Sequence, residues 1–213
     1  MKQEKKSKKE IKVIIFDIGG VLLQSSYHKV IKRLAKIYNL DAEKLFKIII
    51  KYSKQIQTGK ISLKKYYQSI SKELNLKNPK ELAFIWNFLI GKKFKINSGV
   101  EKIIKNLRKK YLVGTLTNVS KNHEIVRVKK KAYRHFKIKL TSLDHGLMKP
   151  DIRFYELLIK KLKVCPEKII FIDNHEENLI PAKKLSIKTI LFKNNRQLIK
   201  DLKKFGVKIL KKI

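Results

Sequence analysis

The sequence predicts an α/β protein with a mostly parallel sheet, interrupted after its first strand by an all-helical insert. Short runs rich in β-branched and aromatic residues are typical of strands, and they occur at 11–17, 112–117, 138–142, 168–173 and 187–192. Lysine-rich segments with helical periodicity separate the later runs, which is the pattern of successive βα units. Residues 18–111 contain no comparable strand pattern and repeat their apolar residues at helical spacing instead.

The insert can be divided into four predicted helices. Their apolar repeats are Tyr27, Val30, Ile31, Leu34 and Tyr38; Leu45, Ile48, Ile49 and Tyr52; Tyr66, Tyr67, Ile70 and Leu74; and Leu82, Ile85, Trp86 and Leu89. The stretch "NPKE" at 78–81 supplies an Asn cap, a first-turn proline and a glutamate. The capping box "SGVE" at 98–101 predicts that Ser98 caps the helix of about 99–110, which returns the chain to the sheet.

These assignments divide the chain into a tail, a core and a lid. Residues 1–10 form a basic tail, residues 11–23 and 97–213 form the core, and residues 24–96 form the four-helix lid. A last strand is expected at 206–210, after Gly206. A chain of 213 residues is long enough for one sizeable core with a small insert.

The charge of the chain is strongly positive. Lys and Arg total 53 against 17 acids, a net charge of +36, so the surface should attract polyanions such as nucleic acid, or anionic metabolites. Only six of these cations are arginine, the residue best suited to bidentate phosphate and base contacts. A compositional bias is therefore the preferred interpretation, and non-specific polyanion binding is the alternative.

Other features point to a cytoplasmic protein without membrane contact. No apolar run approaches the roughly 20 residues that a membrane span needs. The start "MKQEKKSKKE" lacks the apolar stretch of a signal peptide. The single cysteine, Cys165, excludes an intramolecular disulfide and fits a reducing compartment.

Polar residues follow the predicted strands where each strand ends. Asp17 ends the first strand, Thr117 and Asn118 end the second, and Asp173 and Asn174 end the fourth. In open α/β sheets, ligands bind at these carboxyl ends. Each residue alone has an ordinary structural explanation, such as a helix cap, but their order along the chain predicts a shared site.

Two further residues belong to this pattern. Lys149 stands before Pro150, just ahead of a predicted helix, and is suited to neutralise a phosphate and its carboxylate partner. Asn178 is expected to tie down the loop that follows Asp173.

With these residues in place, the chain resembles the haloacid dehalogenase (HAD) superfamily of phosphohydrolases. The resemblance covers about residues 11 to 210 and is most detailed in "TNVS", "GLMKPDIRFYELLIKKL" and "FIDNHEENLIPAKKL". The stretch "QTGKIS" at 57–62 also resembles a turn in the helical cap of one subgroup. The resemblance implies a Rossmann-like core, an α-helical cap and Mg²⁺.

The resemblance also implies roles for the residues of the pattern. Asp17 would be the nucleophile, Thr117 and Asn118 would hold phosphate oxygens, and Lys149 would stabilise charge on the nucleophile and phosphoryl group. The metal ligands would be Asp17, the main-chain oxygen of Gly19, and Asp173 with Asn174. Trp86, Tyr66 and Tyr67 could select the substrate, although a place in the core of the cap is the preferred interpretation.

Two residues depart from the family pattern. Gly19 stands where most phosphatases of the family carry an acid/base aspartate, and Asn174 replaces a charged metal ligand. His28, His145 and His175 are candidates to replace the missing acid, although ordinary loop positions are preferred for all three.

The resulting prediction is a magnesium-dependent HAD hydrolase acting on a small phosphorylated metabolite. Two alternatives remain: a catalytically degraded HAD protein that only binds its ligand, and a basic protein that associates with nucleic acid. The sequence does not identify the substrate or the oligomeric state.

Overall fold

The computed structural model describes residues 10–24 and 27–209. Apart from Glu10, the predicted basic tail lies outside these residues. The core is one five-stranded sheet in the order β5-β4-β1-β6-β7, with all neighbours parallel. Its strands are β1 (Val13–Phe16), β4 (Leu112–Thr117), β5 (Ile138–Thr141), β6 (Ile169–Asp173) and β7 (Lys188–Leu191). The predicted parallel α/β core is therefore confirmed, although most of its strands are shorter than expected.

Helices cover both faces of the sheet, which explains why the central strand β1 and the first four residues of β6 are apolar throughout rather than alternating. The helices of the core are α5 (Ser98–Leu107), α6 (Lys121–Lys129), α7 (Ser142–His145), α8 (Ile152–Leu162), α9 (Glu176–Lys184) and α10 (Asn195–Lys204), with a short 3₁₀ helix at Pro166–Lys168. Along β1, Val13 and Ile15 face a cluster that includes Phe154 of α8. Ile14 and Phe16 face the opposite cluster, which continues into the insert.

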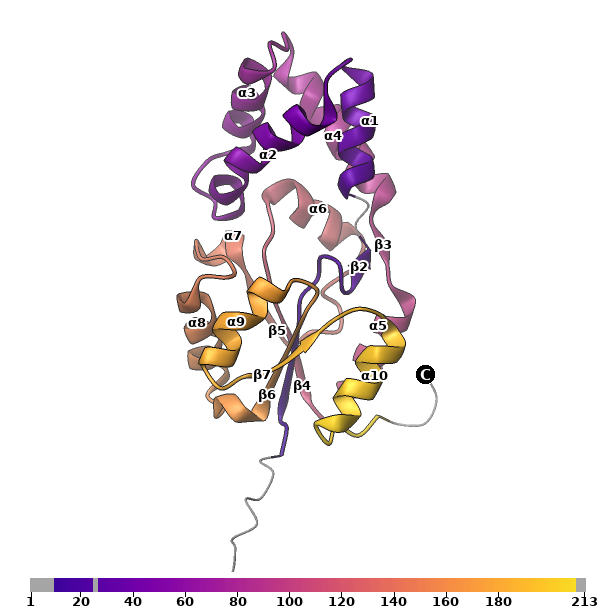
Figure 1. The fold of residues 1–213 in the computed structure, drawn as a ribbon, viewed down its shortest axis with the longest axis vertical. Coiled ribbons are helices and arrows are strands. Elements are labelled where there is room, and N and C mark those ends of the chain that lie inside the picture. Colours follow the sequence, from indigo (N-terminus) through magenta and orange to yellow (C-terminus); the bar gives the residue numbers. More distant parts are fainter. Residues whose placement is uncertain (1–9, 25–26, 210–213) are drawn as a thin grey trace, which may run out of the picture.

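The four predicted helices of the insert are present. They are α1 (Tyr27–Ile37), α2 (Ala42–Gln57), α3 (Leu63–Glu73) and α4 (Pro79–Lys93). Figure 1 shows them beyond the carboxyl ends of the strands, with α6 between them and the sheet. Trp86, Tyr66 and Tyr67 are buried, as the preferred interpretation requires. In the described part of the chain, no helix combines the length and the apolarity that a membrane span requires.

Three local predictions were wrong. The insert is bounded by a short antiparallel pair, β2 (Leu23–Gln24) with β3 (Lys95–Ile96), in a region where no strand was expected. Helix α5 is capped by Asn97, whose side chain accepts a hydrogen bond from Val100 N, and Ser98 is already its first residue. No strand forms at 206–209, because Gly206 takes a left-handed φ of 78° and Val207 N returns to Leu202 O, which closes α10. Residue 210 lies outside the described residues.

Candidate active site

A buried ion-pair triad lies at the carboxyl end of the sheet. Lys149 Nζ is 2.9 Å from Asp17 Oδ1 and 2.5 Å from Asp173 Oδ2. Asp17 follows β1 and Asp173 ends β6, and these neighbouring strands pair Phe16 with Ile172. The parallel register therefore brings the two carboxylates together from distant parts of the sequence. Lys149 is 2% exposed, Asp17 6% and Asp173 0%, so the triad is shielded from water.

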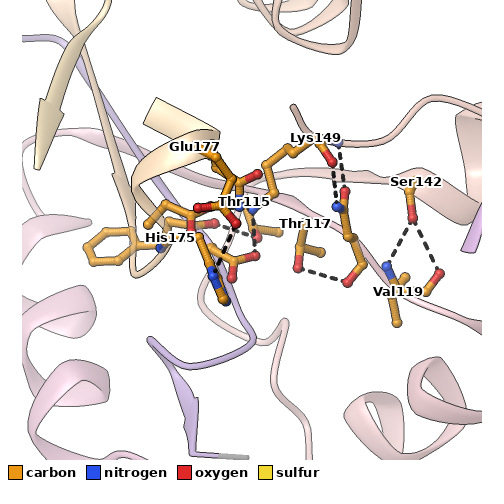
Figure 2. A network of polar contacts seen from close by, with 12 residues as sticks. Thr115, Thr117, Val119, Ser142, Lys149, His175 and Glu177 are labelled. Atoms are coloured by element: carbon orange, nitrogen blue, oxygen red, sulfur yellow. Dashed lines mark hydrogen bonds and ion pairs between the residues drawn. The ribbon is translucent and has the colours of Figure 1, made fainter. Parts of the chain in front are cut away.

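Lys149 is held from behind by Asn118. The Asn118 amide donates from Nδ2 to Lys149 O at 2.9 Å, and its Oδ1 accepts from Lys149 N at 2.9 Å. This reciprocal pair fixes the loop ahead of α8 against the end of β4 (Figure 2). The structure thus places the Asn118 side chain on the Lys149 backbone, and not free for a phosphate oxygen as the resemblance implied.

Both carboxylate oxygens of Asp173 accept hydrogen bonds. Its Oδ1 accepts from His175 N at 2.9 Å, and its Oδ2 accepts from Asn178 Nδ2 at 3.1 Å as well as from Lys149. Burial raises the pKa of the Asp173 carboxyl, Lys149 opposes that rise, and the charge of Asp17 adds to it. Asn178 ties down the loop after β6, as the sequence predicted.

None of the three histidines proposed as a replacement acid lies beside Gly19. The side chain of His175 is 57% exposed and lies 3.4 Å from Glu177 Oε1 (Figure 2). The ring of His145 packs near Phe154, and His28 is exposed. The preferred interpretation as loop positions was wrong for His28, which lies in α1, and for His145, which ends α7; His175 stands just ahead of α9.

The space beside Gly19 is occupied by Arg127, which sequence reasoning missed. A Cβ atom at Gly19 would lie 3.4 Å from Arg127 Nη2 and 3.9 Å from Asp17 Oδ2. Arg127 is 5% exposed and comes from α6. It donates from Nη1 to Thr117 Oγ1 at 3.1 Å and from Nη2 to Asn118 O at 3.3 Å. One hint of Arg127 was present in the sequence, namely that arginine is scarce in this chain, but scarcity does not indicate where an arginine lies in the fold.

The insert reaches this site through its "QTGKIS" turn. Ser142 Oγ donates to Gln57 O at 2.7 Å and accepts from Val119 N at 2.9 Å, which joins the turn to the loop after β4. Figure 2 shows the Ser142 hydroxyl beside Val119. A cavity of about 340 Å³ adjoins Lys149 in this region. Its lining includes Lys54, Thr58 and Lys60 of the insert together with Arg153 of the core. The cationic lining suits an anionic small molecule.

Comparison with known proteins identifies the family. The model of the haloacid dehalogenase-like hydrolases matches residues 11–185. The chain belongs to this family.

Solved HAD structures share the fold of this hydrolase. A HAD family enzyme from Bacteroides thetaiotaomicron is 23% identical with a TM-score of 0.76, over 87% of this chain and 95% of that one. The same enzyme in complex with magnesium and inorganic phosphate is 24% identical with a TM-score of 0.74, over 86% and 94% of the two chains. A HAD-like family hydrolase from Porphyromonas gingivalis is 20% identical with a TM-score of 0.76, over 93% and 98%.

Curated relatives match over a shorter region. Bifunctional epoxide hydrolase 2 of Mus musculus is 32% identical over 71 residues, which are 33% of this chain and 13% of the mouse protein. The protein of the same name from Sus scrofa is 32% identical over 77 residues, 36% of this chain and 14% of that protein. The chain therefore spans only a small part of these relatives.

The residues of the site fit a magnesium ion, which several structures of HAD neighbours contain. Asn174 Oδ1 is buried and has no hydrogen-bond partner in the described part of the chain. Its amide packs on the turn after β1, since a Cβ at Gly20 would come within 2.5 to 2.7 Å of the Asn174 side chain. An amide oxygen, the Asp17 carboxylate and a main-chain oxygen are hard ligands of the kind Mg²⁺ prefers. Among the described residues, no group of three or more His, Cys, Asp and Glu side chains offers a metal site, so the amide and backbone would have to complete the set.

Helix α6 also carries a histidine that is kept neutral by the fold. The His123 ring packs edge-on to Tyr27 and Phe94, and its Nε2 is buried without a hydrogen-bond partner among the described residues. Burial lowers the pKa of His123 to about 3, and the charge of Arg127 adds to this effect.

This histidine should make the protein sensitive to mild acid. The unfolded chain protonates His123 near its ordinary pKa of about 6.5, whereas the folded protein resists protonation down to about 3. Above about pH 6.5 neither state protonates His123, and the free energy of unfolding is at its full value. Below that pH only the unfolded chain takes up the proton, so the free energy of unfolding falls. We expect wild type to lose about 1.4 kcal/mol from this residue between about pH 7.5 and 5.5, as measured by urea unfolding.

His123→Phe keeps the aromatic packing and should remove this part of the pH dependence. His28→Phe, at an exposed position, should retain the wild-type dependence. Equal pH dependence in wild type and His123→Phe would contradict the assignment.

Proposed function

We propose that this HAD-like hydrolase is a Mg²⁺-dependent phosphatase that acts on a small phosphomonoester through an aspartyl-phosphate on Asp17. The observation that carries the proposal is the buried triad, in which Lys149 bridges Asp17 and Asp173 at the carboxyl end of the sheet. Support comes from the fold neighbour whose structure contains magnesium and inorganic phosphate.

The residues of the site suit a two-step displacement at phosphorus. An Asp17 oxygen attacks the phosphorus, the bond to the leaving oxygen breaks, and the leaving group departs with the electron pair. Lys149 holds Asp17 Oδ1 and balances the charge that builds up during the transfer. Thr117 Oγ1 accepts from Arg127 and donates to Asn118 O at 3.5 Å, a long hydrogen bond that the hydroxyl would exchange for one to a phosphoryl oxygen. Water then attacks the phosphorus, which releases inorganic phosphate and restores the carboxylate.

The metal would be held by Asp17, the Gly19 main-chain oxygen and Asn174. When bound, Mg²⁺ would neutralise charge on the phosphoryl oxygens. Both oxygens of Asp173 are already hydrogen-bonded, so we assign Asp173 the role of positioning Lys149 rather than ligating the metal. We assign the insert, residues 24–96, the role of a cap over the cavity beside Lys149.

The alternatives differ in how far the site supports them. A ligand-binding protein without activity would not need a buried carboxylate–lysine–carboxylate triad, because burying three charged groups costs free energy. Binding of nucleic acid by the +36 surface stays a prediction from composition.

Asp17→Asn should abolish phosphatase activity, because an amide oxygen cannot accept the phosphoryl group. With p-nitrophenyl phosphate and Mg²⁺, we expect the rate to fall by about 10³-fold or more. EDTA, which removes Mg²⁺, should likewise abolish the phosphatase activity of the wild type. Asp144→Asn, a change of the same kind at an exposed position, should leave the rate unchanged. Wild-type activity in a folded Asp17→Asn variant would show that the site has been assigned wrongly.

Asn174→Asp should strengthen Mg²⁺ binding, because it replaces a neutral oxygen ligand by a charged one. The Mg²⁺ concentration for half-maximal activity should fall by about tenfold. Asn39→Asp adds the same charge at an exposed position between α1 and α2 and serves as the control. If Asn174→Asp and Asn39→Asp need the same Mg²⁺ concentration as wild type, the metal does not contact residue 174.

The absence of a side chain at Gly19 should slow the second step more than the first. A positioned acid or base contributes ~10² to 10⁴ in rate, and among the described residues no carboxylate or imidazole other than Asp17 comes within 4 Å of the place of a Cβ at Gly19. An aryl phosphate, whose phenolate leaves without a proton, should give a rapid burst of about one equivalent followed by a slow steady state. Alkyl phosphates should react more slowly and without a burst. Stopped-flow absorbance with p-nitrophenyl phosphate distinguishes this from a linear time course, which would require a proton donor and acceptor elsewhere in the site.

A further inference from the structure

The geometry points to Arg127 as a phosphate-binding residue, which enters the site from α6 through the space that Gly19 leaves open. This inference rests on the proposed function and extends it, because it names the group that replaces the missing side chain at position 19. Neither the motifs of the sequence nor the comparisons with relatives assign a role to Arg127.

The position of the guanidinium is the first argument. Arg127 Nη2 lies 3.4 Å from the place of a Cβ at Gly19, and Asp17 Oδ2 lies 3.9 Å from the same place. The guanidinium and the nucleophile are therefore neighbours across the position that a side chain at residue 19 would fill. Arg127 also donates from Nη1 to Thr117 Oγ1 at 3.1 Å, the hydroxyl proposed to bind a phosphoryl oxygen.

The second argument is that the buried charge lacks an anionic partner. Arg127 is 5% exposed, and no ion pair joins it to a carboxylate within residues 10–24 and 27–209. Its Nε is buried without a hydrogen bond in the same part of the chain. A buried cation is costly unless it is paired. A phosphate placed between Asp17 and Arg127 would supply the missing anion and could accept two N–H groups of the guanidinium.

The neighbouring acid on α6 is already committed elsewhere. Glu124 Oε2 accepts from the Tyr133 hydroxyl at 2.5 Å, and its Oε1 pairs with Lys139 Nζ at 2.9 Å. Tyr133 lies beside the guanidinium but is neutral, because its burial and Glu124 both raise the pKa of the phenol. The charge of Arg127 thus stays available to a ligand.

The third argument concerns Gly19 itself. A carboxylate at position 19 would meet the guanidinium at close range and pair with it. Glycine at this position keeps the cation unpaired, and the place of the absent Cβ lies between the guanidinium and Asp17 Oδ2. Gly19 therefore leaves the Arg127 guanidinium unpaired, and this guanidinium binds the phosphate at the position where an acid/base side chain would otherwise stand.

The decisive measurement is the affinity for inorganic phosphate, by calorimetry on the full chain with Mg²⁺ present. Arg127→Met removes the guanidinium, and Arg127→Gln removes the charge but keeps a polar amide on the side chain. We expect both to raise the dissociation constant for phosphate by roughly 10- to 100-fold. Arg127→Lys, which restores charge without the planar fork, should recover part of the loss. Arg196→Met removes the same charge from an exposed position on α10 and should bind phosphate like wild type.

The outcomes separate this inference from the proposed function. If wild type hydrolyses p-nitrophenyl phosphate and both neutral variants bind phosphate as tightly as wild type, the role of Arg127 is disproved and the phosphatase assignment stands. A loss of thermal stability without a change in phosphate affinity would also overturn the inference, since it would show a structural role only. If Arg127→Met fails to fold, Arg127→Gln and Arg127→Lys decide the question by the same criterion. If wild type neither binds phosphate nor turns over, both proposals fall together.

Discussion

The site depends on one buried ion pair shared among three residues. Lys149 lies between Asp17 and Asp173, and none of the three is more than 6% exposed. Charges this deeply buried are stable only when they are paired and hydrogen-bonded. The surrounding structure meets that condition from several directions, with His175 N and Asn178 binding Asp173, and the Asn118 amide binding the Lys149 backbone. The parallel register of β1 and β6 is what makes the pairing possible.

The chemistry of the site follows from how the charges around this triad are distributed. Two carboxylates and one lysine give the triad a net charge of −1. A bound divalent metal would offset this charge and that of a phosphoryl group. Arg127 adds a second buried cation on the side of Gly19. Under the proposed function, a site with this balance would stabilise a bound dianionic phosphate more than it would assist proton transfer to and from its esters.

The insert is tied to the core at points that lie next to the site. The β2–β3 pair joins the two segments through which the chain enters and leaves the insert. The Ser142 hydroxyl donates to Gln57 O, and Asn122 of α6 donates to the Tyr67 hydroxyl at 3.2 Å. One contiguous apolar cluster runs from a face of the sheet into the four helices. The hydrogen bond from Asn122 to Tyr67 means that the helix that carries Arg127 is also a helix against which the insert packs.

Sequence alone was enough to locate Asp17, Thr117, Lys149 and Asp173, because parallel strands place their carboxyl ends on one edge and each motif marks such an end. It was also enough for the four helices of the insert, whose apolar repeats are regular. It could not place Arg127, because the contact between Gly19 and α6 depends on how the helix packs over the sheet and leaves no local pattern. Sequence alone also could not show that the Asn118 amide, predicted to hold phosphate, binds the Lys149 backbone instead. Nor could it show that residues 206–209 close α10 and do not form a strand. Local pattern determines which polar groups reach the sheet edge, while long-range packing decides which of them remain free to bind a ligand.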